Sequence, residues 1–167
     1  MQTYLLCLWP VCQQEERKAC LKGLIQEYGF TLLREENRSY CYERFWELIA
    51  YIYRGEKWAA SRQGCGVLRK SLWCYQEGSP VTFYLVQAQG DRAKELLALK
   101  EEFRTRSGGH KHSLHTVENP KEAQEVWQRY AAQDRDWPAG HPKRWYLLKL
   151  WMQARIWFKK RLHLVEE

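Results

Sequence analysis

The sequence predicts an α+β fold of the ferredoxin-like type: a four-stranded antiparallel sheet with helices on one face, followed by a basic aromatic helix. Three observations support this prediction. Strand-like and helix-like segments follow one another in the order β-α-β-α-(α)-β-α-β-α. The 167 residues show no internal repeat and suffice for one domain, or for one domain with an appendage. Apolar residues make up 45% of the chain, which is enough for a sizeable core.

The first half of the chain alternates between strand-like and helix-like segments. The opening segment TYLLCLW favours a strand and stops at Pro10. The next segment has apolar residues at helical spacing, ends at Gly29 and is followed by the strand-like FTLLR. A strongly apolar helical segment then closes at Gly55, and a shorter helix is expected before Gly78. We therefore expect a strand at residues 3–9, a helix at 15–28, a strand at 30–34, a helix at 43–53 and a short helix within 64–78.

The second half continues this alternation. VTFYLVQA is the clearest strand, because it is rich in β-formers and bounded by Pro80 and Gly90. Asp91 is the expected cap of the helix that follows, and Asn119 and Pro120 suit the cap and first position of the last helix of the body. We expect strands at residues 81–88 and 112–117 and helices at 91–106 and 120–132, with Ala93, Leu96, Leu97, Leu99 and Phe103 facing inward from the first of these helices.

The charge is concentrated near the end of the chain. The formal net charge is +7, and residues 141–167 contain seven lysines or arginines against two glutamates. Turn-forming residues precede this basic segment. We therefore predict a domain at residues 1–133, a linker at 134–142 and an amphipathic basic helix at 143–167.

The cysteines and the apolar segments indicate the compartment. The six cysteines show no zinc-ligand spacing, and most lie in apolar segments where a free thiol packs as a small hydrophobe. The N-terminus lacks the pattern of a signal peptide, and no apolar segment approaches the length of a membrane span. We predict a cytoplasmic protein with reduced thiols, with peripheral attachment to the inner membrane surface left open.

His115 is the main candidate for chemistry. It ends a strand-like segment and lies just before the helix start at Asn119, where free backbone N–H groups favour an anion such as phosphate. The plainer alternative is a satisfied polar residue at a strand end. As a nucleophile, His115 would form a phosphohistidine, and Glu118 or Glu125 would hold the ring tautomer. The candidate phosphate-binding residues are Lys100, Arg104, Arg106, Lys111 and His112, for which a solvated basic helix face is the alternative.

No metal site is expected from the nearby histidines. His110, His112 and His115 cannot all point the same way from one strand, and no cysteine is close to them in sequence.

The C-terminal segment predicts a contact surface. Aromatic and apolar residues would gather on one side of the expected helix and basic residues on the other. A helix packed on the domain or on a protein partner is one interpretation, and a helix lying on anionic lipid is the other. Nucleic acid is less favoured, because the chain has no recognised nucleic-acid motif. The candidate contact residues are Trp145, Trp151, Trp157, Lys149, Arg155, Lys159 and Lys160.

Five segments together resemble nucleoside diphosphate kinase, over about residues 3–130 and in the correct order. They are Thr3–Pro10, Gly29–Leu33, Pro80–Val86 with Gly90 and Ala93, Leu114–Glu118, and Ala123. The resemblance implies a ferredoxin-like core, phosphate carried on His115, and ATP or another nucleotide bound with Mg²⁺. It also leaves a homo-oligomer open. A weaker resemblance, of residues 99–103 and 111–115, is to a branch of this fold associated with bacterial cell-surface polysaccharide genes.

The chain also departs from the family pattern. Trp9 stands where the family has a phosphate-binding lysine, Val11 stands where it has an aspartate, and the long loop before the catalytic strand has no counterpart. Two functional hypotheses follow. The first is a divergent, kinase-like phosphotransferase that acts through His115, with a role in cell-surface polysaccharide biosynthesis. The second is a catalytically inactive scaffold or peripheral-membrane interaction protein on the same fold.

Overall fold

The computed structural model describes residues 1–60, 65–108 and 111–132, together with Leu147, Leu150, Trp151 and Ala154. The chain divides into two compact units, Met1–Tyr40 with Trp73–Trp137 and Cys41–Leu72 with Pro138–Glu167. The predicted domain boundaries at residues 133–134 and 142–143 lie outside the described residues.

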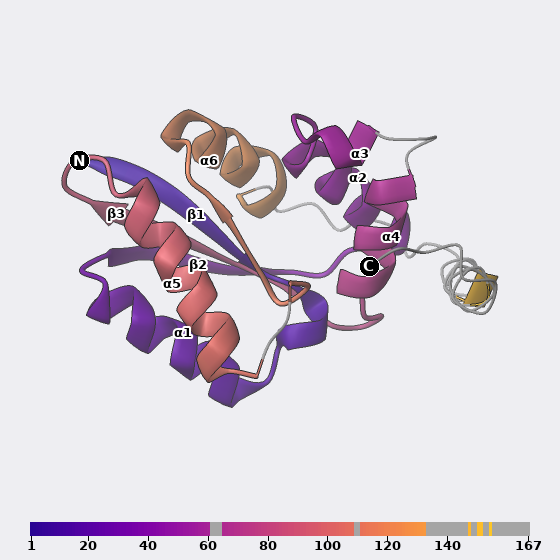
Figure 1. Ribbon diagram of the computed structural model, residues 1–167, viewed down its shortest axis with the longest axis horizontal. Coiled ribbons are helices and arrows are strands. Elements are labelled where there is room, and N and C mark those ends of the chain that lie inside the picture. The colour runs from indigo at the N-terminus through magenta and orange to yellow at the C-terminus, as the bar shows by residue number, and fades with distance from the viewer. Residues whose placement is uncertain (61–64, 109–110, 133–146, 148–149, 152–153, 155–167) are drawn as a thin grey trace, which may run out of the picture. The chain divides into compact units, whose positions relative to one another are not determined.

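The first unit is built on a four-stranded sheet. Its strands are β1 (Gln2–Leu8), β2 (Thr31–Arg38), β3 (Val81–Ala88) and β4 (Leu114–Val117). They pair antiparallel in the order β2-β3-β1-β4, so β1 and β3 are central and β2 and β4 form the edges (Figure 1). This order confirms the predicted ferredoxin-like α+β fold. The short 3-10 turn η1 (Pro10–Cys12) follows β1. The first strand therefore stops before Pro10, as expected.

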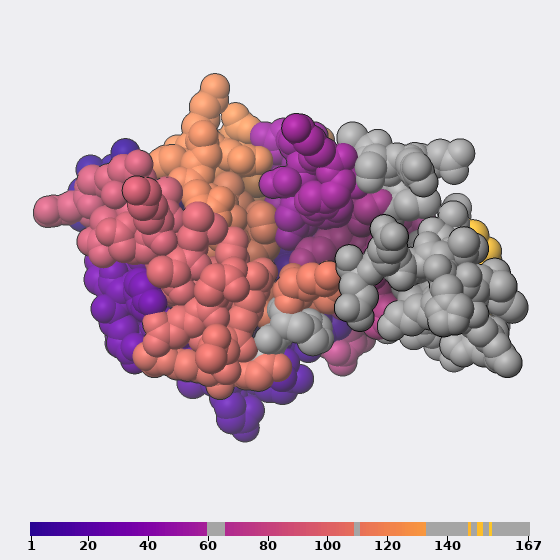
Figure 2. Space-filling model, in the orientation of Figure 1, coloured from indigo at the N-terminus to yellow at the C-terminus, as the bar shows by residue number. Residues whose placement is uncertain are grey.

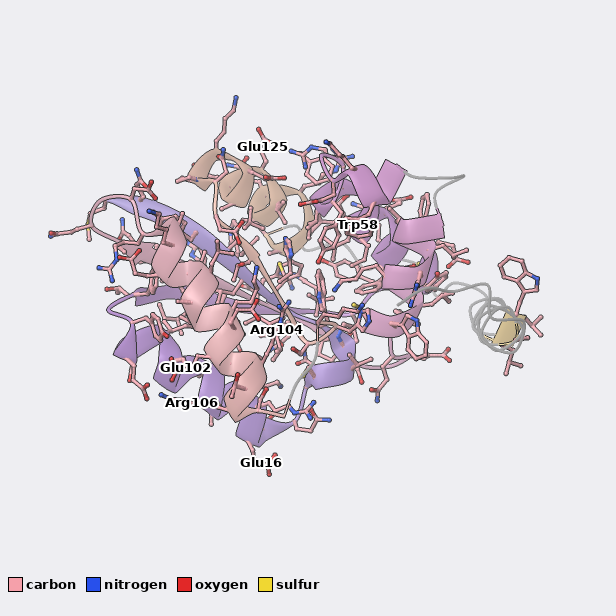
Figure 3. The ribbon with its side chains drawn as sticks, viewed as in Figure 1. Glu16, Trp58, Glu102, Arg104, Arg106 and Glu125 are labelled. Atoms are coloured by element: carbon pink, nitrogen blue, oxygen red, sulfur yellow. The ribbon has the colours of Figure 1, made fainter. Side chains whose placement is uncertain are left out.

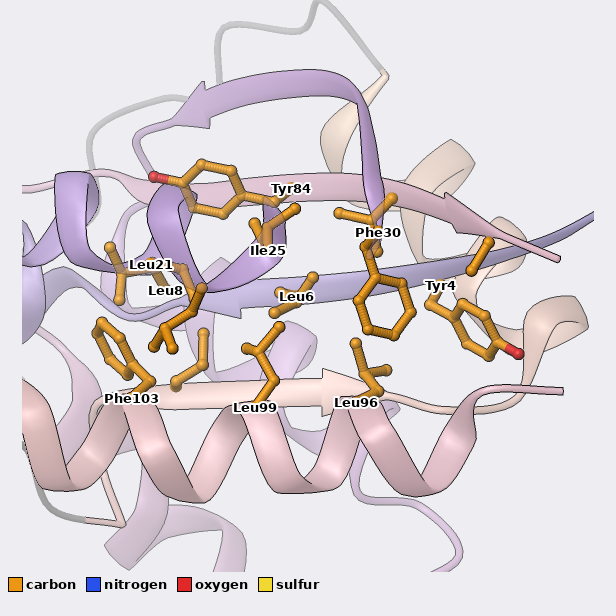
Figure 4. Packing of buried hydrophobic residues seen from close by; sticks show 14 of the residues in the cluster. Tyr4, Leu6, Leu8, Leu21, Ile25, Phe30, Tyr84, Leu96, Leu99 and Phe103 are labelled. Carbon is orange, nitrogen blue, oxygen red and sulfur yellow. The ribbon is translucent and has the colours of Figure 1, made fainter. Parts of the chain in front are cut away.

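Helices α1 (Glu15–Glu27) and α5 (Ala93–Arg106) cover one face of the sheet, as Figure 1 shows. Leu6 of β1 and Tyr84 of β3 are register partners on this face, and they pack with Leu99 of α5 in the main core cluster (Figure 4). Leu96 and Phe103 also face inward as predicted. Leu97 does not: it is 41% exposed on the outer side of α5, which forms part of the surface in Figure 2.

The opposite face of the sheet carries α6 (Pro120–Val126) and the π-helical turn η2 (Trp127–Ala131). The side chain of Arg38, on β2, donates from Nε to the Ala131 carbonyl oxygen at 2.6 Å on this face. The predicted cap of the helix is confirmed, because the Asn119 side-chain oxygen accepts the backbone N–H groups of Lys121 and Glu122 at 3.0 and 3.2 Å. The helices of the first unit therefore lie on both faces, with α1 and α5 as the predicted layer.

The second unit contains the helices α2 (Tyr42–Ile52) and α3 (Lys57–Ala60) and most of α4 (Cys65–Cys74). Helix α2 buries an apolar stripe, and the buried Tyr42 hydroxyl lies 2.8 Å from the hydroxyl of the buried Ser71. Burial raises the pKa of Tyr42 to about 12, so this phenol stays protonated and can donate. In the described part of the chain no helix combines the length and the apolar content needed to cross a bilayer.

Candidate functional site

His115 lies in β4 on the sheet face opposite to α1 and α5. It pairs in register with Cys7 of β1, whereas its neighbour Thr116 pairs with Leu6, which belongs to the α1 and α5 core. Side chains alternate between faces along a strand, so the imidazole faces the side of α6. His115 is half-buried there. Burial raises the pKa of the Cys7 thiol far above its ordinary range, so this neighbour remains a neutral thiol.

The imidazole of His115 stacks on the indole of Trp9. The ring centroids are 6.1 Å apart and the planes are inclined by 25°. Trp9 is fully buried, and its backbone N–H extends the sheet by donating to the Ser113 carbonyl oxygen at 3.0 Å. Stacking covers a face of the imidazole, but the nitrogen lone pair lies in the ring plane. The contact therefore constrains the orientation of the imidazole plane.

The acid predicted to orient His115 lies on the other face of the sheet. Glu118 accepts a hydrogen bond from the fully buried Thr116 hydroxyl and forms an ion pair with Lys100 of α5 at 3.6 Å. Both partners belong to the α5 side. The structure therefore does not bring Glu118 and His115 together, because the contacts of Glu118 lie on the α5 side of the sheet.

Two further predicted phosphate-binding cations also belong to α5. Arg104 pairs with Glu101 at 2.6 Å and donates to the Leu114 carbonyl oxygen at 3.4 Å. Arg106 pairs with Glu27 of α1 at 2.9 Å and with Glu102 at 2.5 Å. Figure 3 shows these arginines on α5, across the sheet from α6. With Lys100, they form ion pairs on the α1 and α5 side of the sheet, and their role in binding phosphate stays a prediction.

Arg106 belongs to a network of polar contacts on the surface at the end of α5. The Tyr28 hydroxyl donates to the Glu102 carboxylate, which lowers the pKa of Glu102 and raises that of Tyr28. The same carboxylate raises the pKa of Arg106. Each group therefore stabilises the charge or the proton of its neighbour, and the network ties α1 to α5.

The remaining predicted site residues lie in different places. His112 stacks on Trp73 with centroids 6.2 Å apart, and its Nδ1 lies 3.8 Å from the Cys74 Sγ. Lys111 is exposed just before β4. Glu125, the second acid considered for His115, is half-buried on α6, and thus on the correct side of the sheet (Figure 3). Its role in orienting the ring stays a prediction.

Two polar side chains that the sequence did not single out, those of Gln13 and Thr82, meet beside the turn that follows β1. Gln13 donates from Nε2 to the Leu8 and Trp9 carbonyl oxygens at 2.9 and 3.3 Å. Its Oε1 lies 2.7 Å from the hydroxyl of Thr82, a fully buried residue of β3. No motif marks either residue, since they meet only once the strands are paired.

A cluster of three or more His, Cys, Asp or Glu side chains that could hold a metal ion does not occur among the described residues. Of the predicted C-terminal contact residues, Trp151 is described: it is helical and 52% exposed. The others lie outside the described residues, namely Trp145, Trp157, Lys149, Arg155, Lys159 and Lys160.

Comparison with known proteins gives a likeness of fold. No known family model matches the chain, and no curated protein matches it. The nucleoside diphosphate kinase of Aquifex aeolicus is similar with a TM-score of 0.50 and 17% identity, over 76% of this chain and 92% of that one. A nucleoside-diphosphate kinase of Borrelia burgdorferi, solved with vanadate and ADP, has a TM-score of 0.47 and 12% identity over 81% and 93%. The chain thus has the fold of the Aquifex enzyme, and at this identity the likeness extends to the fold alone.

Proposed function

We propose that this protein is a divergent phosphotransferase that passes a phosphoryl group from a nucleoside triphosphate to an acceptor through His115. The observation that carries the proposal is the presentation of a half-buried imidazole on β4, stacked on Trp9 with its nitrogens in the ring plane. The likeness in fold to a nucleoside diphosphate kinase supports the same class of reaction.

The proposed reaction has two displacement steps. A neutral nitrogen of His115 attacks the γ-phosphorus, and the bond to the bridging oxygen breaks as the nucleoside diphosphate leaves with the electron pair. An acceptor oxygen then attacks the phosphohistidine, the P–N bond breaks and the imidazole is restored. The acceptor proton is released to solvent.

Magnesium would enter with the nucleotide. The described residues present no cluster of ligands that would hold the ion by themselves. Mg²⁺ commonly keeps several waters and binds through substrate phosphates, where it neutralises charge. The proposed steps therefore use only the histidine and the two substrates.

Two classes of acceptor follow from the proposal. Nucleoside diphosphates are one class to test, because of the fold. Sugar phosphates are the other, because the sequence resembles, in residues 99–103 and 111–115, a branch associated with cell-surface polysaccharide genes.

Labelling with γ-³²P-ATP and Mg²⁺ tests the proposal. The wild-type chain should acquire label that is stable in base and lost in acid, and His115→Ala should acquire none. His163→Ala is the matched control, and it should label as the wild type does. Absence of label from the folded wild-type chain, or equal label on His115→Ala, would overturn the proposal.

A second candidate is a non-catalytic scaffold that binds an anionic membrane surface. Leu147, Leu150 and Trp151 are helical, lie three and four residues apart, and are 64%, 44% and 52% exposed. In the surrounding sequence, residues 141–167, the seven lysines and arginines outnumber the two glutamates. An exposed apolar stripe within a basic segment is the pattern that binds interfaces rich in anionic lipid.

Vesicle flotation tests the second candidate. The full chain should float with phosphatidylserine vesicles and not with neutral vesicles. Replacing Leu147, Leu150 and Trp151 together by serine should abolish flotation. The matched control, Leu97→Ser, removes an exposed leucine from α5 and should leave flotation unchanged. Equal flotation of the triple variant and the wild type would eliminate this candidate.

A further inference from the structure

A chain of partly buried polar contacts holds the turn that follows Trp9. Gln13 follows the turn η1, and its side-chain amide donates to the carbonyl oxygens of Leu8 and Trp9. The Trp9 carbonyl oxygen also accepts the backbone N–H of Cys12 at 2.9 Å. The chain reversal after β1 is therefore closed by a side chain as well as by backbone hydrogen bonds.

The direction of these hydrogen bonds is fixed by proton counting. Because the Gln13 NH₂ group serves two carbonyl oxygens, Gln13 Oε1 must face Thr82 as an acceptor. The single proton of the Thr82 hydroxyl is used in this bond. The Thr82 oxygen also lies 2.6 Å from the Asn37 side-chain oxygen, but Thr82 has no second proton to donate. This contact is a hydrogen bond when the Asn37 amide is flipped, so that its NH₂ group donates to the Thr82 oxygen.

Thr82 is well suited to this role. It is fully buried in the central strand β3. Its register partner on β1 is Leu8, whose carbonyl oxygen accepts a hydrogen bond from the Gln13 side-chain NH₂ group. The Thr82 hydroxyl donates to Gln13 Oε1 and so helps to hold the Gln13 amide in one orientation. The network thus runs from β2 through β3 to the turn after β1.

We infer that Gln13 is a positioning residue that fixes the Trp9 indole against His115, and that Thr82 holds Gln13 in its working orientation. Trp9 is anchored at its N–H by Ser113, which immediately precedes β4, and at its carbonyl by Gln13 and Cys12. Its ring can therefore pack at a constant angle on the imidazole. The catalytic consequence rests on the proposed function of His115, whereas the structural consequence does not.

Two substitutions test the inference by removing the polar contacts with little change in side-chain volume. Gln13→Met removes the amide, and Thr82→Val removes the hydroxyl that orients it. The ring current of Trp9 shifts the imidazole C–H proton resonances of His115, which are assigned by their loss in His115→Gln. Both variants should move these resonances toward the shifts of the same histidine in Trp9→Leu. Thr82→Ser restores the hydroxyl and should restore the wild-type shifts.

The labelling rate provides the catalytic readout. If His115 is the phosphoryl carrier, misplacing its ring in Gln13→Met should slow phosphohistidine formation by roughly tenfold to a hundredfold, the order of loss caused by small misalignments. Gln26→Met, on the exposed side of α1, is the matched control and should change neither readout.

The two readouts separate the two proposals. If the wild-type chain never labels but its His115 resonances move in Gln13→Met and Thr82→Val, the positioning role stands and the phosphotransferase proposal fails. If both variants are folded and the resonances stay at their wild-type shifts, the positioning role is overturned. Should Gln13→Met not fold, the Thr82→Val and Thr82→Ser pair decides the matter by itself.

Discussion

Replacing Glu118 tests the finding that this acid serves the fold and not His115. Thr116 is fully buried and its hydroxyl donates to the Glu118 carboxylate. Glu118→Ala leaves that hydroxyl without its acceptor, which costs about 1–3 kcal/mol. The ion pair with Lys100, at 3.6 Å and with side chains 15% and 33% exposed, adds at most about 1 kcal/mol. We expect a loss of about 2 kcal/mol for Glu118→Ala.

Urea unfolding at pH 7 measures this loss, and a double-mutant cycle assigns it. Glu118→Gln keeps an oxygen acceptor for Thr116 and should cost less than about 1 kcal/mol. In a Thr116→Val background no hydroxyl is left unsatisfied, so Glu118→Ala should then cost only the ion pair, less than about 1 kcal/mol. An equal cost of Glu118→Ala in both backgrounds would refute the hydrogen-bond assignment.

The same variants separate the two faces of the sheet. If His115 is phosphorylated, Glu118→Gln should form phosphohistidine at a rate within about twofold of wild type, which corresponds to less than about 0.5 kcal/mol. Loss of label in a Glu118→Gln protein of wild-type stability would mean that the acid acts on the histidine. The placement of the two side chains on opposite faces would then be incorrect.

Three further substitutions test local features. Tyr28 donates to Glu102 and lowers the folded-state pKa of that carboxyl below 4.5, so this stabilisation is present above pH 4.5 and is lost as the pH falls through the lowered value. Tyr28→Phe should raise the Glu102 pKa in a carboxyl-carbon NMR titration and flatten the acid-side loss of stability. Asn119→Ala should cost about 1 kcal/mol in urea unfolding, and Asn119→Asp much less. In Gly66→Ala the new Cβ would lie 2.2 Å from a backbone carbonyl oxygen of α3, so its melting temperature should fall by the equivalent of about 1–3 kcal/mol or more. The control Gly23→Ala, in α1 with nothing within 4 Å of its Cβ, should not be destabilised.

The elements could be predicted where the sequence marks both ends. β3 runs from Val81 to Ala88 as expected, because Pro80 and Gly90 bound a continuous β-rich segment. Helix α5 was also expected, but Leu97 was placed inside. Leu96 and Leu99 face the sheet and Leu97 is rotated out of their stripe, so it is exposed although its residue type is apolar.

The site could be predicted only as far as one residue's place in its strand. His115 occupies the expected strand. Side chains three residues apart on a strand point to opposite faces, which is how His112 was separated from His115. The same argument would have placed Glu118 on the face opposite to His115. The contacts of Lys100 with Glu118 and of Arg104 with the Leu114 carbonyl oxygen could not be inferred, because they depend on α5 packing beside β4. Neither could the meeting of Gln13 with Thr82, which depends on the pairing of β1 with β3.

The division of charge between the two faces bears directly on the proposed chemistry. A phosphoryl group on His115 would add negative charge to the face that carries Trp9, while Lys100 and Arg104 form ion pairs on the other face. An indole can orient an imidazole, but it cannot neutralise a phosphate. Phosphoryl transfer here would therefore depend on alignment of the histidine and on cations brought by the substrate, more than on fixed charges of these elements. This makes the contacts that hold Trp9 in place the part of the site on which the proposed reaction most depends.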